Sequence, residues 1–228
     1  MTVSIWEGRM QTPTPVRRRN ATYYGGDLRR DLLDAALRVV ADEGPAAVNL
    51  RALARELGVS HAAPANHFAD KTAIFTAIAQ EGFELLWQAI DQAVTEVPGD
   101  QPAAARLRAA GTGYMTFALT HRAHFEVMWR SDLLRRDDAG LHAAGEATFA
   151  QLMDAVEAAQ AEGWAARAEQ RTVAYLAWAA VHGLAALWLG GPLRNQEDRP
   201  FEAVAAAVFD LLNQSLAAGH RNTQTFPA

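Results

Sequence analysis

An all-helical fold is what this sequence of 228 residues predicts, and its composition and its periodicity both indicate it. Half of the residues are apolar, but the excess is in alanine and leucine, which favour helices, and not in β-branched residues. Apolar side chains recur every three or four positions along most of the chain, with charges between them. No stretch of useful length alternates as a strand does. The chain is long enough for one large or two small domains.

Charge divides the chain into two unlike parts, although the formal net charge is only −5. Residues 1–71 carry ten basic and eight acidic side chains, whereas residues 72–228 carry eleven and eighteen. This division predicts that only the N-terminal part meets a polyanion. The chain has no cysteine, which excludes disulfides and thiolate-held metals and makes a reducing cytoplasm the expected compartment.

The first elements can be placed in order from the N-terminus. Residues 1–26 lack the apolar run of a signal peptide and are predicted to be a disordered basic arm. A first amphipathic helix begins near Leu28 and stops at Gly44-Pro45. Asn49 is the expected cap of a second helix, which Gly58 ends.

The stretch "GVSHAAPANHFADK", residues 58–71, predicts a third and unusually bare helix. With Ser60 as its cap, Pro64 falls in the first turn, where it costs far less than in a helix interior. Pro64 and Phe68 are four residues apart and can both face the core, which leaves small and polar side chains outward. Three short helices of this kind indicate a helix-turn-helix domain whose third helix enters a groove closely.

A long fourth helix follows the expected cap Asp70 and is apolar on two sides, so we expect it to couple two bodies. "PGDQPA" at 98–103 is the clearest boundary beyond it. Further helices are predicted near 103–120, 122–130, 140–162, 167–189 and 200–217. The expected domains are a DNA-binding domain at 27–73, a ligand-binding and dimerisation domain at 74–218, and a tail at 219–228.

In its first third the sequence resembles the TetR family of bacterial transcriptional regulators. The resemblance covers about residues 27–75: the first amphipathic helix, "LRALARELGVS", "HF", and the lysine three positions after that phenylalanine. It implies a homodimer that binds double-stranded DNA at a pseudo-palindromic operator, most simply a repressor that a small effector releases. By position, the resemblance implies that the DNA-binding residues are Asn49, Arg51, Ser60, His61, Ala62, Ala63, Ala65, Asn66, His67 and Lys71. Of these, Arg51 and residues 61–63 are expected in the major groove, and Asn49, His67 and Lys71 at phosphates.

One departure from the family pattern concerns affinity for DNA. Ala65 stands where the family usually has tyrosine, and Asn66 where a basic or aromatic residue is common. DNA binding is therefore expected to depend more on Arg51 and on the arm at Arg17–Arg19. An alternative follows, in which the chain is a helical small-molecule-binding or interaction protein that has lost strong DNA affinity. Salt-dependent binding to duplex DNA separates the two.

The C-terminal half carries a second resemblance. Trp178, His182 and Gly183 match W-x3-H-G, which marks one branch of TetR-like C-terminal domains. The helices near 167–189 and 200–217 are predicted to form a four-helix interface, two from each chain. Residues 172–193 carry no formal charge apart from what His182 acquires, and they are also long enough for a membrane span. A mid-span histidine and a Gly-Gly-Pro end oppose that alternative, so no membrane is expected.

Aromatic residues and histidines at helical spacing in "GYMTFALTHRAHFEVMW" (113–129) indicate either an ordinary core or a ligand pocket. Because ligand sites are mostly apolar with few polar groups, an apolar or aromatic effector is expected there. The predicted ligand-binding residues are Tyr114, Phe117, His121, Phe125, Trp129, Trp178 and His182.

An enzyme is the third alternative, and little in the sequence favours it. His121 and His124 could share a metal, but no third ligand stands at a recognisable spacing. Glu126 and the pair Asp137-Asp138 are the other candidates, without a nucleophile elbow or phosphate-cradling loop. We therefore expect no catalytic site, no metal and no cofactor.

Overall fold

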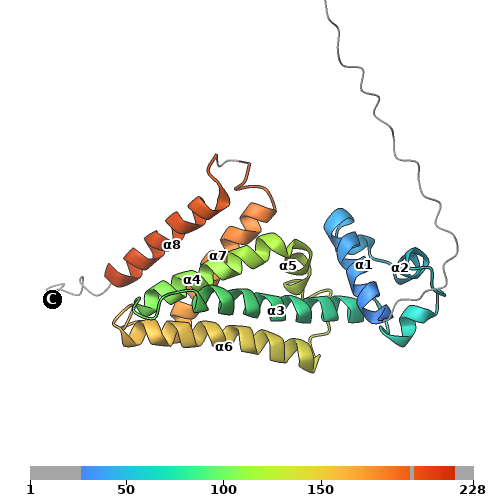
Figure 1. Ribbon diagram of the computed structural model, residues 1–228, viewed down its shortest axis with the longest axis horizontal. Coiled ribbons are helices and arrows are strands. Elements are labelled where there is room, and N and C mark those ends of the chain that lie inside the picture. The colour runs from blue at the N-terminus through green and yellow to red at the C-terminus, as the bar shows by residue number, and fades with distance from the viewer. Residues whose placement is uncertain (1–26, 196–197, 219–228) are drawn as a thin grey trace, which may run out of the picture.

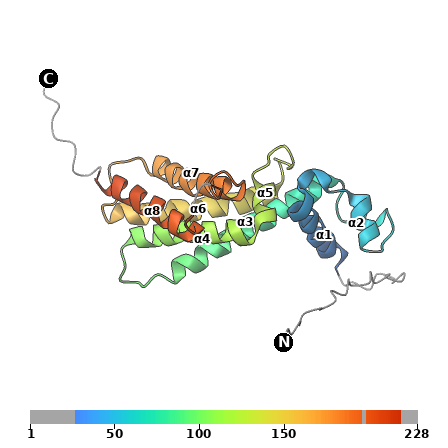
Figure 2. The ribbon, with the colours of Figure 1, turned by 90° about the horizontal axis from the view of Figure 1, so that it is seen from above.

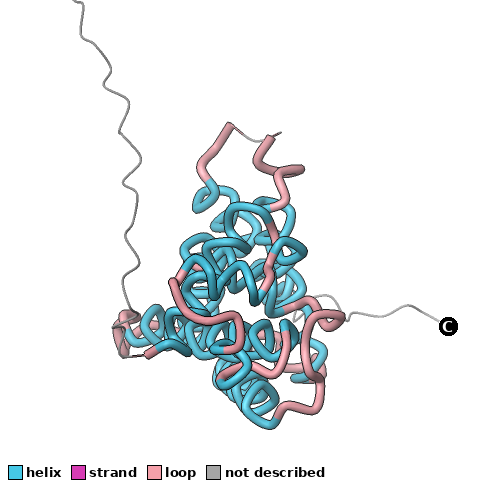
Figure 3. Tube along the Cα trace, turned by 90° about the vertical axis from the view of Figure 1, so that its right-hand side faces the viewer, coloured by secondary structure: helices cyan, strands magenta, loops and turns pink. Residues whose placement is uncertain are grey.

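The computed structural model describes residues 27–195 and 198–218, and every regular element within them is a helix (Figure 3). The predicted all-helical fold is confirmed. A small N-terminal domain lies at one end of an elongated molecule, and a larger helical domain makes up the rest (Figure 1). The predicted arm, with Arg17–Arg19, and the predicted tail lie outside the described residues.

The N-terminal domain begins with α1 (Leu28–Glu43) and α2 (Leu50–Glu56), joined through the short 3-10 helix η1 (Pro45–Ala47). Both helices have a side-chain cap, and the Asn49 cap of α2 was predicted. The Asp27 carboxylate accepts a hydrogen bond from the Arg30 N–H (3.1 Å), and the Asn49 side-chain oxygen accepts from the backbone N–H groups of Arg51 and Ala52. Gly44 ends α1 at a φ of +84°, a conformation that favours glycine.

The third element is shorter and tighter than the sequence predicts. It is the 3-10 helix η2 (Ala63–Asn66), and Ser60 does not cap it through its side chain. Pro64 has no N–H to donate to the Ser60 carbonyl, which instead accepts from Ala63 at 3.0 Å. The i→i−3 bonds continue from Ala65 and His67. Pro64 and Phe68 are buried together, as predicted, and the Phe68 N–H donates to the Pro64 carbonyl at 2.9 Å.

Helix α3 (Lys71–Thr95) joins the two domains (Figure 1). Its first turns bury Ile74, Phe75 and Ile78 in the core of the N-terminal domain, and its later turns bury Leu86 and Ile90 in the core of the C-terminal domain. The helix therefore contacts two bodies, but it divides between them along its length and not by opposite faces. The boundary that we placed after residue 73 falls within this continuous helix.

The C-terminal domain contains α4 (Ala103–Thr120), α5 (Arg122–Met128), α6 (Ala139–Ala161), α7 (Gln170–Leu189) and α8 (Phe201–Ala218). Helices α3, α4 and α6 pack against one another along the long axis (Figures 1 and 2). Gly113 permits the close approach of α4 to α3, since a Cβ there would lie 2.5 Å from the Ala89 carbonyl oxygen. The short helix α5 lies where the two cores meet: Val127 belongs to the N-terminal core, and Phe125 and Met128 belong to the C-terminal core.

Candidate DNA interface and ligand cavity

The surface of η2 is small and polar, as the sequence predicts for a segment that approaches DNA. Ser60, His61, Ala62, Ala65, Asn66 and His67 are exposed, and Ala63 is half-buried. Arg51, on α2, is also exposed. The nearby Arg38 pairs with Glu56 at 2.8 Å and Arg30 pairs with Glu81 at 2.6 Å. Among the described residues no carboxylate pairs with Arg51, so its guanidinium is not committed within the protein.

Asn49 and Lys71 each have a structural contact besides the phosphate role that we predict for them. Asn49 caps α2 through its side-chain oxygen, which leaves its amide N–H groups to donate elsewhere. The Lys71 ammonium donates to the Ala46 carbonyl at 2.9 Å and lies 5.3 Å from the centre of the Phe75 ring. Lys71 therefore connects the start of α3 to η1, the short helix that precedes α2.

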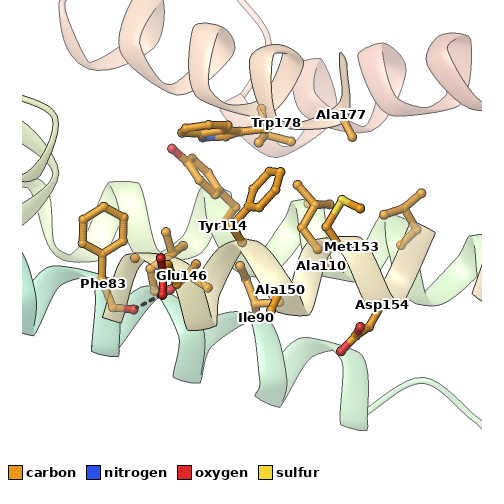
Figure 4. A pocket seen from close by; sticks show the side chains of 18 of the residues that line it. Phe83, Ile90, Ala110, Tyr114, Glu146, Ala150, Met153, Asp154, Ala177 and Trp178 are labelled. Atoms are coloured by element: carbon orange, nitrogen blue, oxygen red, sulfur yellow. Dashed lines mark hydrogen bonds between the residues drawn. The ribbon is translucent and has the colours of Figure 1, made fainter. Parts of the chain in front are cut away.

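A cavity of about 790 Å³ lies within the C-terminal domain, between α3, α4, α6, α7 and α8 (Figure 4). This volume is in the range of small-molecule sites. Its wall is mainly apolar and aromatic, with charged side chains at the ends. The principal lining side chains are Phe83, Leu86, Ile90, Leu107, Tyr114, Trp129, Leu134, Phe149, Leu152, Met153, Trp164, Trp178, Val181 and Phe209.

Of the seven predicted ligand residues, three line this cavity: Tyr114, Trp129 and Trp178. Their role in ligand binding stays a prediction. The other four predicted residues do not line this cavity: Phe117, His121, Phe125 and His182. Along α4 the cavity faces the turns from Leu107 to Tyr114, whereas Phe117 is fully buried near the α5 end of the helix.

His182 supports the cavity wall from behind. Its Nδ1 shares a hydrogen bond of 2.8 Å with the Tyr114 hydroxyl, and its ring packs on Trp129 with centroids 4.9 Å apart. Burial lowers the pKa of His182 below its ordinary value, so the imidazole is neutral at pH 7. Burial likewise raises the pKa of the Tyr114 hydroxyl. A neutral pair of this kind fixes the orientation of Tyr114 and Trp129 toward the cavity.

Helix α6 forms part of the cavity wall, and this was not predicted from the sequence. Phe149, Leu152 and Met153 of this helix form much of one wall, and Figure 4 shows Met153 and Ala150 facing Tyr114 and Trp178 across the cavity. Their spacing is that of any amphipathic helix, so the sequence contains no signal that separates them from core residues. Trp164, in the turn after the end of α6, also lines the cavity and was not predicted.

The candidates for metal binding and catalysis have structural explanations. No group of three potential metal ligands occurs among the described residues. His124 is buried, with its Nε2 3.8 Å from the Glu81 carboxylate, and His121 stacks on Phe117. Burial lowers the pKa of His124. Asp138 caps α6 by accepting from the Leu141 N–H at 2.9 Å.

Helix α7 is apolar but largely uncovered. It is long and apolar enough to cross a membrane by length and composition, and only 22% of its most apolar window is buried. Tyr175, Leu176 and Leu187 are exposed, and a Cβ at Gly183 would meet nothing within 4 Å. Exposed residues recur at Leu176, Ala179 and Leu187, one face of the helix.

Comparison with known proteins identifies both domains. The family model of bacterial regulatory proteins of the tetR family matches residues 32–78, and the model of a tetracyclin repressor-like C-terminal domain matches residues 107–219. The chain belongs to the TetR family of transcriptional regulators. The predicted family is confirmed, and the chain is therefore a DNA-binding transcriptional regulator.

Solved structures agree with this assignment. A protein of unknown function from Rhodococcus sp. RHA1 is 36% identical, with a TM-score of 0.74 over 86% of this chain and 98% of that one. The TetR family regulator PfmR from Thermus thermophilus is 20% identical, with a TM-score of 0.64 over 80% and 97%. AibR, solved with isovaleryl coenzyme A and operator DNA, is 17% identical, with a TM-score of 0.63 over 81% and 97%. The last two share the TetR fold; no curated protein sequence matches the chain.

Proposed function

We propose that this TetR regulator is a homodimeric, cytoplasmic repressor that leaves its operator when a small apolar or aromatic effector enters the cavity. The observation that carries the proposal is the cavity itself, because it lies against α3, the helix that also forms part of the N-terminal core. An occupant in contact with Phe83 and Leu86 therefore touches the element that positions the DNA-binding surface. The similar regulator AibR, solved with both isovaleryl coenzyme A and operator DNA, supports this combination of partners.

The DNA side of the proposal assigns roles to exposed residues. The small side chains of η2 let its backbone approach the floor of the major groove, and Arg51 donates to a guanine edge. Asn49, His67 and Lys71 contact phosphates and fix the register. The bare surface at Ala65 places more of the affinity on Arg51 than tyrosine at that position would.

The uncovered face of α7, together with α8, supports the dimer. Two copies that pack Ala179 and Gly183 against each other can approach closely, because neither residue carries a bulky side chain. The exposed Leu176 and Leu187 then flank the contact and lose water. This face explains the apolar length of α7 without a membrane.

Selection of binding sites from a random pool of duplex DNA, with the purified protein, tests the function. The expected outcome is a pseudo-palindrome whose half-sites lie about one helical turn or somewhat more apart, because paired η2 segments must enter major grooves on one side. Recovery of an asymmetric single site, or of none, contradicts the proposal. Recovery of no site favours the alternative that Ala65 suggests, a ligand-binding helical protein without strong DNA affinity.

A further inference from the structure

The segment Trp129–Asp138, between α5 and α6, touches the cavity and the N-terminal domain at once. Trp129, Ser131, Leu134 and Arg136 line the end of the cavity nearest that domain, which we call the near end. Leu134 also packs against both hydrophobic cores. The next residue, Arg135, donates from its backbone N–H to the Thr76 hydroxyl at 3.0 Å and from its guanidinium to the Asp70 carboxylate at 2.9 Å. The near end of the cavity is thus tied directly to the start of α3.

The cavity is elongated, because its wall follows α6 from Leu141 to Asp154. The fourteen residues from Leu141 to Asp154 span about 20 Å of α-helix. The side chains between the two ends are apolar or aromatic for the most part, among them Phe149, Leu152 and Met153. A long apolar body fits this space better than a compact polar one.

The arginines at the two ends of the cavity differ in whether their guanidinium groups have a partner within the protein. At the far end Arg108 pairs with Asp210 at 3.1 Å, and Arg171 donates to the Tyr175 hydroxyl at 2.8 Å and lies over Phe149. At the near end Arg136 and His142 line the wall, and His142 Nε2 lies 2.5 Å from the Arg136 carbonyl oxygen. Among the described residues no carboxylate is paired with the Arg136 guanidinium.

Two carboxylates also line the cavity and must be weighed against an anion. Glu146 lies one turn after His142 on α6, and Asp154 lies toward the far end. Figure 4 shows the Asp154 carboxylate directed away from Tyr114 and Trp178. Asp137 and Asp138 follow Arg136 in the chain, and Asp138 is committed to the Leu141 N–H. Arg136, Asp137 and Glu146 are all exposed, so water screens both the repulsion and the attraction of an anion at the mouth.

We infer that the effector is an amphipathic anion: its long apolar body lies along α6, and its carboxylate or phosphate group binds Arg136 at the near end. The inference rests on the proposed function, since it names the ligand class of that same cavity. Arginine binds such oxygens through paired N–H donors, and burial of the ligand's apolar body against the apolar middle of the wall adds free energy of binding. An anion at Arg136 binds one residue away from Arg135. It therefore lies next to the residue whose hydrogen bonds reach Asp70 and Thr76 at the start of α3.

A series of three ligands with one apolar chain tests this inference without DNA. Decanoate, decanol and decyltrimethylammonium, each below its micelle concentration, are titrated into the full chain, with tryptophan fluorescence as the readout because Trp129, Trp164 and Trp178 line the cavity. Decanoate is expected to bind most tightly and the cation most weakly. Arg136→Gln should lower the affinity for decanoate about tenfold, the loss of one charge-assisted contact, and leave that for decanol unchanged.

Arg108→Gln is the matched control, because it removes the same charge at the far end. It should leave decanoate affinity within about twofold, and Arg136→Lys should restore part of what Arg136→Gln loses. The inference is overturned if decanol or the cation binds as tightly as decanoate, if Arg108→Gln and not Arg136→Gln weakens decanoate, or if no member binds. These titrations need no operator, so a failure to bind DNA would remove the proposed function and leave the ligand class standing.

Discussion

At the scale of single residues, the structure separates side chains that look alike in the sequence. Arg30 and Arg38 are held by carboxylates, whereas Arg51 is exposed next to the capped start of α2. His182 is held by Tyr114, whereas His61 and His67 are exposed near η2. The residues with these internal partners support the fold, and the exposed residues near η2 are the ones that we expect to read DNA.

Arg51→Ala should weaken operator binding by about 1–3 kcal/mol and relax base preference at one position of each half-site, because it removes a guanine contact. Lys71→Met should weaken all sequences alike and reduce the salt slope by about 1 per lysine removed, since it removes a phosphate contact but retains packing on Phe75. Binding titrations at several salt concentrations, on selected and scrambled sites, measure both. An unchanged sequence preference in the first variant and an unchanged salt slope in the second would contradict these roles.

The free energy of unfolding should fall as the pH is lowered from about 7.5 to 5.5. The pKa values of His182 and His124 are lowered in the folded protein by burial, from an ordinary value of 6.5. The unfolded chain therefore takes up protons first, and stability that is present above pH 6.5 is lost as the pH falls toward the folded pKa values. Urea unfolding measures the effect. His182→Asn, which can still accept from Tyr114, should flatten the dependence; equal slopes in both proteins would remove His182 as a cause.

At the scale of elements, α3, α5 and the segment after α5 connect the two domains. Val127 of α5 enters the N-terminal core, while its neighbour Met128 enters the C-terminal core. Leu134 packs against both cores and also lines the cavity. An occupant that displaces Leu134 therefore disturbs the packing around α3 even where it does not touch α3 itself.

Leu134→Ala should uncouple ligand binding from DNA release. Decanoate affinity should fall because Leu134 lines the cavity, but even at saturation the loss of operator affinity caused by decanoate should shrink by about fivefold, or about 1 kcal/mol of coupling. Leu133→Ala is the matched control, because Leu133 packs against the N-terminal core but does not line the cavity. Operator titrations with and without decanoate give the coupling. A control variant that uncouples as strongly as Leu134→Ala would assign the effect to general loosening of the core.

At the scale of the whole molecule, the protomer leaves an apolar helix face that a second copy can cover. The exposed Leu176, Leu187 and Leu211 lie on α7 and α8, the helices that we expect at the dimer interface. In the proposed function, operator recognition at a pseudo-palindrome and effector release would both depend on how the two N-terminal domains are spaced. A dimer would then be the unit in which the cavity and the DNA-binding surface act together.

Gly183→Leu should weaken dimerisation at least tenfold while each protomer stays folded, because the added side chain enters open space in the protomer and crowds a partner helix. Gly99→Leu is the control, since a Cβ there also meets nothing within 4 Å and the residue lies outside α7. Sedimentation equilibrium and circular dichroism measure association and folding. Undiminished dimerisation of the Gly183 variant would place the interface elsewhere.

Saturating operator DNA should weaken decanoate binding, typically by about 5–150-fold, by the same factor with which decanoate weakens operator binding. This reciprocity follows because a ligand shifts the equilibrium only through its different affinities for the two states. Calorimetry with and without operator measures it. Equal decanoate affinities in the two titrations would mean that occupation of the cavity does not regulate DNA binding.

The sequence by itself determined the helices, their order and the family. Helical spacing around Leu32, Leu53 and Leu107 has one solution, and the caps Asp27, Asn49 and Asp70 fix the starts of α1, α2 and α3 because they act locally. The burial of Pro64 with Phe68 was also predictable, since four residues separate them. The short helix η1 was not predicted, and neither was the tightening of η2, where Pro64 removes the hydrogen bond that an α-helix needs.

Only the tertiary structure decided which aromatic residues surround a cavity and which fill a core. Tyr114 and Phe117 lie three residues apart on one helix, yet Tyr114 faces the cavity and Phe117 is fully buried, because different helices oppose successive turns of α4. Met153 and Trp164 join the wall from distant parts of the chain, and Leu134 reaches both cores for the same reason. Periodicity tells which side of a helix is apolar, but a cavity forms where several helices fail to close on one another, and that depends on their packing together.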